Sequence, residues 1–260
     1  MIRKTFSVPP LGCNCSIIGD PITKQAIVVD PGGAPERILQ DVRSMGLTVV
    51  SIVHTHAHFD HFLASGAMKQ ATGAALCLHP DDLPLWDILE MQCRMFGVPY
   101  VPAPQPDYWL KDEERLAIGE MEGIALHTPG HTPDSVCLVV RDLRRGDEPW
   151  FVITGDTLFV GAVGRPDLAG QEREMAAQLY ETLQTRLLSL PNELEIYPGH
   201  QAGSACGAGR SEVGSQGIAL SAGRGPPSAS VKRPWASRST VWPCTPCSPC
   251  ASGSRKKSSP

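Results

Sequence analysis

The stretch TVVSIVHTHAHFDH, residues 48–61, places four of the chain's eight histidines within eight residues, directly after an apolar run. The run at 48–53 is typical of a buried strand. If the chain stays extended beyond it, alternate side chains project to one side, so His56 and His58 converge on one point. Asp60 and His61 stand where the next helix should begin. Because imidazole and carboxylate together suit zinc, iron or manganese, this stretch predicts a metal site at a strand end.

Three later segments end in the same way. Each is an apolar run followed by a turn, with a glycine directly before a side chain that can bind a metal: LHTPGH ends at His131, VITGD at Asp156 and IYPGH at His200. Glycine permits a tight turn and a close approach of the backbone. Loops at strand ends are where rigid scaffolds carry function. The candidate ligands are therefore His56, His58, Asp60, His61, His131, Asp156 and His200.

Seven ligands are too many for one ion but suit two ions that share a carboxylate. Asp156 is the natural bridge. We expect the remaining six to divide into His56, His58 and His131 on one ion and Asp60, His61 and His200 on the other. Two metals about 3.5–4 Å apart can hold a shared hydroxide and stabilise the charge that develops when it attacks a carbonyl.

Plainer interpretations exist for single residues. Asp60 could serve only as a helix N-cap, and Asp156 only as a turn residue. His54 either orients a ligand or is simply the last residue of the strand. We expect His79 and His127 to be ordinary surface or hydrogen-bonded core residues.

The body of the chain alternates between strand and helix patterns, which predicts an α/β architecture. We expect strands at 25–30, 48–53, 75–79, 123–131, 135–140, 150–156 and 194–200, the fourth and last running into loops, and helices at 34–46, 61–73, 81–97 and 172–190.

The last 60 residues differ from the rest, since 28 of them are Ser, Gly or Pro. That composition predicts one domain over residues 1–208 and a low-complexity tail over 209–260 that is disordered or aberrant. The tail contains CTPCSPC (244–250), whose spacing occurs in iron–sulfur ligation, but the usual fourth cysteine does not follow it. The plainer interpretation is a Pro- and Ser-rich tail that happens to carry thiols.

Charge and cysteine usage limit the function classes. Residues 1–200 contain all of the acidic residues except Glu212, so this part of the chain is strongly acidic. An acidic surface repels nucleic acid, and we therefore expect no nucleic-acid partner. The chain shows no apolar run of 18 residues and no leader pattern, so we expect no membrane partner and a cytoplasmic location. The scattered cysteines of the body fit reduced thiols.

THAHFDH, TPGHT, TGDTLF and YPGH resemble, in the same order, the motifs of the metallo-β-lactamase superfamily. The similarity covers about residues 3–208. It implies an αββα sandwich with metals between the sheet edges, the same assignment of the seven ligands, and a catalytic role for Asp60 in orienting a nucleophilic hydroxide. A C-terminal helical domain with glutathione-binding basic residues, as in full-length glyoxalase II, has no counterpart here.

Within the superfamily the chain resembles both hydroxyacylglutathione hydrolases (glyoxalase II-like proteins) and persulfide dioxygenases. VVDPGG (28–33), TGDTLFVGAVGRPDL (154–168) and IYPGHQAGSACG (196–207) carry this resemblance. It leaves the reaction open.

The first hypothesis is a hydrolase that cleaves a thioester such as an S-acylglutathione, with two divalent metals, zinc first, or iron or manganese. The second is a dioxygenase with one Fe(II) held by His56, His131 and Asp156. The third is an inactive or non-enzymatic metal-binding relative. Under the first two we expect a small thiol-derived substrate. Arg165 either contacts its anionic group or forms a structural ion pair.

Overall fold

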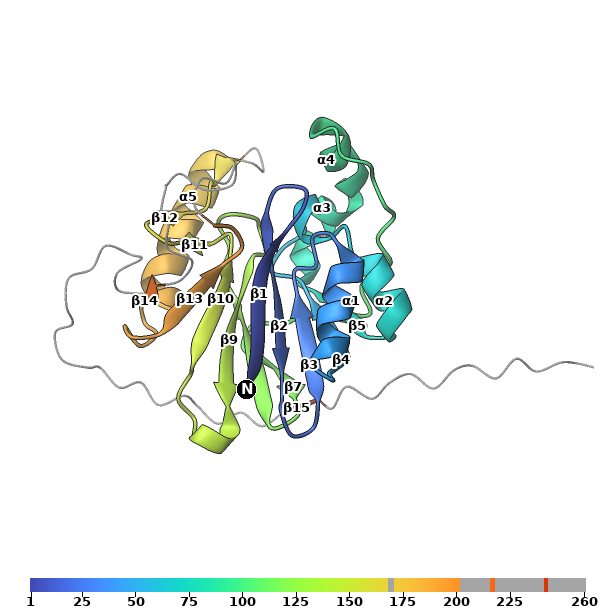
Figure 1. Ribbon diagram of the computed structural model, residues 1–260. Coiled ribbons are helices and arrows are strands. Elements are labelled where there is room, and N and C mark those ends of the chain that lie inside the picture. The colour runs from blue at the N-terminus through green and yellow to red at the C-terminus, as the bar shows by residue number, and fades with distance from the viewer. Residues whose placement is uncertain (168–170, 202–215, 218–240, 243–260) are drawn as a thin grey trace, which may run out of the picture.

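The computed structural model describes residues 1–167, 171–201, 216–217 and 241–242. Two β-sheets pack face to face, and helices cover the outer face of each (Figure 1). This arrangement confirms the αββα sandwich.

The first sheet has six strands in the order in which they follow in the chain: β1 (Ile2–Val8), β2 (Cys13–Gly19), β3 (Gln25–Val29), β4 (Thr48–Val53), β5 (Ala75–Leu78) and β6 (Tyr108–Trp109). Strands β3 to β6 run parallel. Two helices make the crossovers, α1 (Pro35–Ser44) between β3 and β4 and α2 (Ser65–Thr72) between β4 and β5. The carboxyl ends of β3, β4 and β5 therefore meet at one edge of the sheet.

The second sheet is mostly antiparallel. Its order is β14 (Gln216–Gly217), β13 (Glu195–Pro198), β10 (Phe151–Gly155), β9 (Val136–Asp142), β8 (Met121–His127), β7 (Glu114–Ile118) and β15 (Val241–Trp242). Strands β10 and β13 are parallel, and α5 (Glu172–Thr182) lies in the connection between them. A small hairpin, β11 (Leu158–Phe159) and β12 (Ala162–Val163), precedes that helix.

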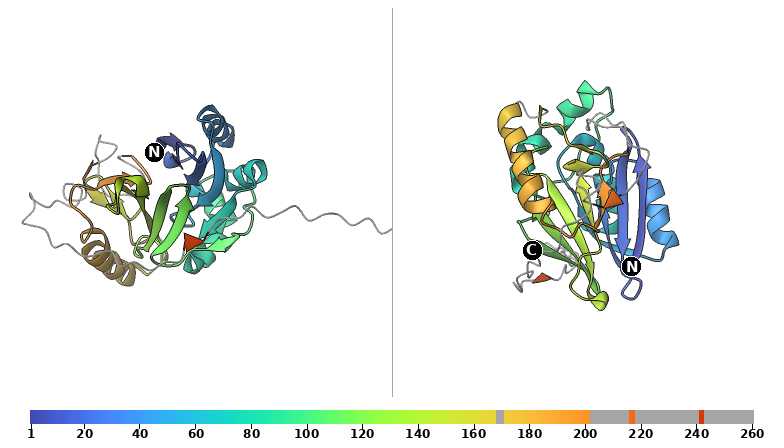
Figure 2. Two further views of the ribbon diagram at one scale, coloured as in Figure 1. Left: turned by 90° about the horizontal axis from the view of Figure 1, so that it is seen from below. Right: turned by 90° about the vertical axis from the view of Figure 1, so that its left-hand side faces the viewer.

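Buried apolar side chains fill three layers. The central layer lies between the sheets and includes Ile27 and Val53 from the first sheet and Leu138 and Phe151 from the second. One outer layer joins the first sheet to α1 and α2, and the other joins the second sheet to the segment that follows α5. In the view from below, α1 and α5 lie on opposite sides of the two sheets (Figure 2). Because both faces of each sheet are covered, a strand such as β9 is buried along its whole length.

Three expected helices differ from the structure. The segment 81–97 is not one helix but a 3₁₀ turn, η2 (Pro80–Asp82), followed by α3 (Leu83–Asp87) and α4 (Leu89–Met95). The break falls at Ile88, whose φ of −106° and ψ of 14° leave the helical range.

The second difference is at 61–73. There α2 begins only at Ser65, after a single 3₁₀ turn, η1 (Phe59–His61), because the side chains of that turn are buried at the sheet edge. The expected helix 172–190 also ends earlier, in a π-helical turn at Leu183–Leu187.

Most of the expected tail, 209–260, lies outside the described residues, as does CTPCSPC. Two pairs of residues within it are described. Gln216–Gly217 pairs with β13 and Val241–Trp242 with β7, so the composition did not predict these short strands. Among the described helices, none has the length and apolar character needed to cross a membrane.

Candidate metal centre

The structure brings all seven candidate ligands to one edge of the sandwich. Four of them lie in the first sheet's connection between β4 and α2, and one each follows β8, β10 and β13 of the second sheet. His56 and His58 lie in the loop after β4, Asp60 and His61 in η1, His131 after β8, Asp156 after β10 and His200 after β13. The loops after β4 in the first sheet and after β8, β10 and β13 in the second sheet therefore meet at this edge.

Three imidazoles form the first group. The Nε2 atom of His56 lies 3.0 Å from Nδ1 of His58, which lies 3.2 Å from Nε2 of His131. With zinc–nitrogen bonds of 2.0–2.1 Å, the ligands of a tetrahedral ion stand about 3.3 Å apart. The donor set and spacing of this group therefore fit one divalent metal.

Asp60, His61 and His200 form the second group. The Nε2 atoms of His61 and His200 are 3.3 Å apart, and Oδ2 of Asp60 lies 3.1 Å from Nε2 of His200. All three side chains are buried. This set also fits a metal, with two nitrogens and one oxygen.

Asp156 lies between the groups. Its Oδ1 is 3.7 Å from Nε2 of His61, and its Oδ2 is 3.6 Å from Nε2 of His131 and 3.5 Å from Nε2 of His200. One carboxylate thus reaches imidazoles of both groups, which is the placement that a bridging ligand needs.

Two glycines make this convergence sterically feasible. A Cβ at position 199 would lie 2.3 Å from Oδ1 of Asp156, so only glycine lets the His200 loop approach that carboxylate. Gly130 has a φ of 136°, and a Cβ there would lie 2.4 Å from the backbone of Leu179 in α5. Both positions are the residues directly before a candidate ligand.

Asp30 is a functional residue that the sequence interpretation missed. It follows β3, and its carboxylate accepts hydrogen bonds from the amide and hydroxyl of Thr55, at 2.8 and 2.7 Å. The Thr55 hydroxyl in turn lies 3.0 Å from Nδ1 of His56, and Oδ2 of Asp30 lies 3.0 Å from Nδ1 of His61. An aspartate directly after a buried strand was the signal that could have found it.

These contacts orient the ligand nitrogens. A proton held on Nδ1 of His56 and of His61 leaves each Nε2 lone pair facing the centre. His131 achieves the same result with a backbone contact, since its Nδ1 lies 3.1 Å from the carbonyl oxygen of Arg165. With the proton on Nδ1, each of these rings presents the tautomer that metal binding requires.

The pKa values of the first group are also suited to ligation. Burial, followed by the neighbouring imidazoles His61 and His58, lowers the pKa of His56 well below its usual value. Burial likewise lowers the pKa of His131, and it lowers the pKa of His58 to about 4. These imidazoles are neutral near pH 7, as ligands must be.

Asp60 remains ionised despite its burial. Burial by itself raises the pKa of this carboxyl, but the imidazoles of His61 and His200 outweigh it and hold the pKa below its usual range. An ionised carboxylate at this position can accept a proton or orient a water molecule.

The segment between β5 and β7 supports the ligand loop from outside. Oδ2 of Asp82 accepts a hydrogen bond from the amide of Ala57 at 2.7 Å, and Oε1 of Gln92 accepts one from the amide of Phe59 at 3.0 Å. Ala57 lies between the two histidines at 56 and 58, so these bonds fix the backbone that carries them. Neither Asp82 nor Gln92 was singled out from the sequence.

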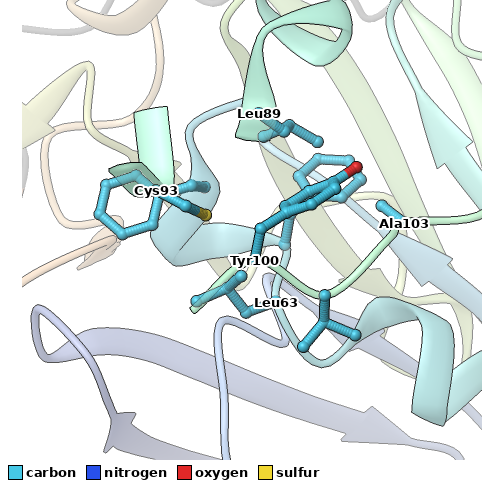
Figure 3. Close-up of a pocket in the computed structure, with 8 residues that line it drawn as sticks. Leu63, Leu89, Cys93, Tyr100 and Ala103 are labelled. Atoms are coloured by element: carbon cyan, nitrogen blue, oxygen red, sulfur yellow. The ribbon is translucent and has the colours of Figure 1, made fainter. Parts of the chain in front are cut away.

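Apolar packing adds to this support. Leu89 and Cys93 of α4, with Tyr100 and Ala103, face Leu63 just beyond η1, around a small apolar cavity (Figure 3). Phe59 of η1 lines the same cavity, so α4 packs against the turn that carries the candidate ligands Asp60 and His61.

His54 does not join the ligand groups. Its ring stacks on Phe62 with centroids 3.4 Å apart, and its Nε2 lies 3.1 Å from the hydroxyl of Ser65. Arg165 lies near His131 through its carbonyl oxygen, while its side chain pairs with Asp167 at 2.8 Å. The ion pair expected as one alternative for Arg165 is therefore present.

Comparisons with known proteins agree with this geometry. The family model of the Metallo-beta-lactamase superfamily matches residues 8–200. The chain is 33% identical over 189 residues to the hydroxyacylglutathione hydrolase GloC of Haemophilus influenzae, covering 72% of this chain and 84% of that protein.

Two solved structures are similar as well. TTHA1623 in a di-iron-bound form is 31% identical, with a TM-score of 0.69, and the match covers 86% of this chain and 98% of the other. ETHE1 from Myxococcus xanthus is 29% identical, with a TM-score of 0.62 and 80% coverage of each chain. With the family model spanning most of the sandwich and its sheet edge, the chain belongs to the metallo-β-lactamase superfamily.

Proposed function

We propose that this protein is a metal-dependent hydrolase that cleaves the thioester of an S-acylglutathione. The observation that carries the proposal is the position of Asp156, within 3.7 Å of imidazole nitrogens from both ligand groups. A shared carboxylate between two groups of three donors favours a pair of divalent ions over a single one.

The residues divide as follows. His56, His58 and His131 would hold one ion, and Asp60, His61 and His200 would hold the other. Asp156, which lies near imidazoles of both groups, would be available to both ions. When bound, such a pair of ions lowers the pKa of water and stabilises the negative charge that develops on a carbonyl oxygen. Zinc is the ion that we expect first, because histidine nitrogens and carboxylate oxygens are its usual ligands. The di-iron form of TTHA1623 supports iron as a second choice.

Asp60, one of the candidate ligands, is also the catalytic residue of this proposal. Its ionised carboxylate lies 3.1 Å from Nε2 of His200 and can orient the attacking water. A thiolate is a good leaving group, so the reaction needs no strong acid. The orienting and ligating carboxylates are therefore sufficient for this chemistry.

The substrate class rests on the relatives. GloC is named a hydroxyacylglutathione hydrolase, and this chain covers most of its length. We propose a small thiol-derived substrate and a cytoplasmic enzyme, with Arg165 as a contact for an anionic group of the substrate. The side chain of Arg165 is 41% exposed, so it can exchange Asp167 for such a group.

The first experiment measures metal content per chain by plasma mass spectrometry on anaerobically purified protein, together with thiol release from S-lactoylglutathione. We expect about two equivalents of metal and metal-dependent thiol release. His56→Ala should abolish turnover, and Asp60→Asn should lower kcat sharply. Asp41→Asn alters a carboxylate on α1 that pairs with Lys4 and belongs to neither ligand group; it is the matched control and should behave as the unaltered protein.

Other outcomes contradict the proposal in distinct ways. One equivalent of iron, with oxygen uptake on glutathione persulfide and no thiol release, would replace the hydrolase by the dioxygenase. Full turnover in His56→Ala would show that the reaction does not depend on the candidate metal centre.

A further inference from the structure

A second cluster of histidine and carboxylate side chains lies outside the seven candidate ligands. His79 follows β5 of the first sheet, His127 ends β8 of the second, and Asp134 lies in the loop between β8 and β9. Nε2 of His127 lies 2.7 Å from Oδ1 of Asp134, while Nδ1 of His79 contacts Oδ2 of the same carboxylate. The cluster thus joins the edges of the two sheets.

The three side chains offer a ligand set for a transition metal. One nitrogen from each imidazole and one carboxylate oxygen all lie within 4.8 Å of one another. The two rings stack, with centroids 4.6 Å apart and planes within 5°, and each turns one nitrogen toward the carboxylate, Nδ1 in His79 and Nε2 in His127. Two histidines and one carboxylate, with a position left for water, form a common zinc ligand set.

Burial leaves one side of the cluster open. The Asp134 side chain is fully buried, and that of His79 is 11% exposed, whereas 29% of the His127 side chain is exposed. The buried carboxylate of Asp134 provides a fixed ligand, and the partly exposed imidazole of His127 leaves a path by which an ion can enter.

Further carboxylates stand around the cluster. Oδ1 of Asp82 accepts the amide of Asp134 at 3.2 Å, and Oδ1 of Asp112 accepts the amide of His127 at 2.9 Å. Arg186 contacts Asp112 and offsets its charge. Asp82 and Asp134, both buried, are then left close together, and a bound cation would stabilise this pair.

We propose that His79, His127 and Asp134 form an additional site for a single zinc ion, separate from the candidate metal centre. The ion would replace the two imidazole–carboxylate contacts, and the ligand atoms would move apart to the spacing of a tetrahedral site. Bound there, it ties β5 of the first sheet to the β8–β9 loop of the second. The proposal is independent of which reaction the enzyme catalyses.

The test compares the full chain with His127→Phe. Phenylalanine keeps a ring stacked on His79 but removes the ligand nitrogen. Both proteins are equilibrated with the same buffered free zinc, and bound metal per chain is measured by plasma mass spectrometry. We expect the unaltered protein to hold one equivalent more than the variant, and its Tm alone to rise when zinc is added after the candidate metal centre has been filled.

Controls separate this site from other zinc-binding groups. Cys244, Cys247 and Cys250 are present in both proteins, so only the difference between the two counts. Asp112→Asn removes a neighbouring carboxylate but none of the three ligands, and it should retain the extra equivalent.

If His127→Phe does not fold, His79→Gln serves instead, because its amide can still donate to Asp134. Equal metal content in the unaltered protein and the folded variant would overturn the proposal. So would a Tm that zinc leaves unchanged in the unaltered protein. Thiol release from S-lactoylglutathione, measured alongside, reports on the hydrolase proposal separately.

Discussion

Oδ2 of Asp30 lies 3.0 Å from Nδ1 of His61, and the same carboxylate accepts two hydrogen bonds from Thr55. Asp30 is buried and has a φ of 50°, in the left-handed region. A non-glycine residue pays an energetic penalty there, which the surrounding contacts must offset. Asp30 thus connects the β3 end to two candidate ligands without itself reaching the centre.

Replacing Asp30 by asparagine should weaken metal binding. Asparagine has one acceptor oxygen in place of two, so it cannot accept from the Thr55 amide and also serve the Thr55 hydroxyl and Nδ1 of His61 as the carboxylate does. Losses of such partners typically cost about 10–100-fold in metal affinity. A competition titration with a chromophoric chelator measures the change. Asp41→Asn is the control. Unchanged affinity in Asp30→Asn would show that Asp30 does not orient the ligands.

His54 predicts a pH dependence of stability. Burial lowers the pKa of His54 to about 3 from its usual 6.5. Below pH 6.5 the unfolded chain therefore binds a proton that the folded chain does not, and stability falls as the pH falls toward 3. At about 1.4 kcal/mol per pKa unit, His54 alone lowers the free energy of unfolding by about 2 kcal/mol at pH 5.

The variant His54→Gln tests this effect, because its amide can still pair with the Ser65 hydroxyl. Urea unfolding at pH 7 and pH 5 gives the loss of stability for each protein. We expect a smaller loss in the variant than in the unaltered protein. Equal losses would mean that His54 is not the group that titrates.

Gln92 should matter more than its position on α4 suggests. It accepts the amide of Phe59 and donates to the carbonyl of Ala57, at 3.0 and 3.2 Å. Gln92→Leu leaves the Phe59 amide and the Ala57 carbonyl buried without these partners. Each unpaired group lowers the free energy of unfolding by up to about 3 kcal/mol. We expect a lower Tm and a lower kcat.

Glu90→Ala is the matched control for Gln92→Leu. Glu90 lies on the same helix and forms only an exposed pair with Arg94, which contributes about 0–1 kcal/mol. If both variants lost the same activity, the effect would belong to α4 as a whole and not to the bonds of Gln92.

Gly199→Ala should disrupt the candidate centre directly. The new methyl group would meet Oδ1 of Asp156 at 2.3 Å and Cε1 of His61 at 3.0 Å, so one ligand group must move. We expect a loss of at least about one bound metal per chain, measured by plasma mass spectrometry. Gly66→Ala, in α2 with no contact closer than 3.4 Å, should keep its metal and be slightly stabilised. Full metal content in a folded Gly199→Ala would contradict this arrangement.

Much of the fold could be predicted from local patterns. The strand expected at 48–53 is β4 (Thr48–Val53), and Gly46 and Gly73, with φ values of 65° and 70°, follow α1 and α2 as expected. These features are local, since they depend on the period of apolar residues and on the freedom of glycine. The strands β1, β2 and β7 were not expected, and their pairing depends on neighbours far along the chain.

The sequence by itself determined which side chains could bind a metal, because each of the seven stands directly after a strand or in the turn that follows it. It also determined that a glycine precedes three of them. The superfamily resemblance rested on these same residues.

Only the tertiary structure decided which of these side chains meet and what supports them. The placement of Asp156 between the two ligand groups, the contact of Asp30 with His61, and the bonds from Asp82 and Gln92 all join residues distant in sequence. The same is true of the cluster of His79, His127 and Asp134 across the two sheets. No local period specifies such contacts, because they arise from how two sheets pack and where their connecting loops meet.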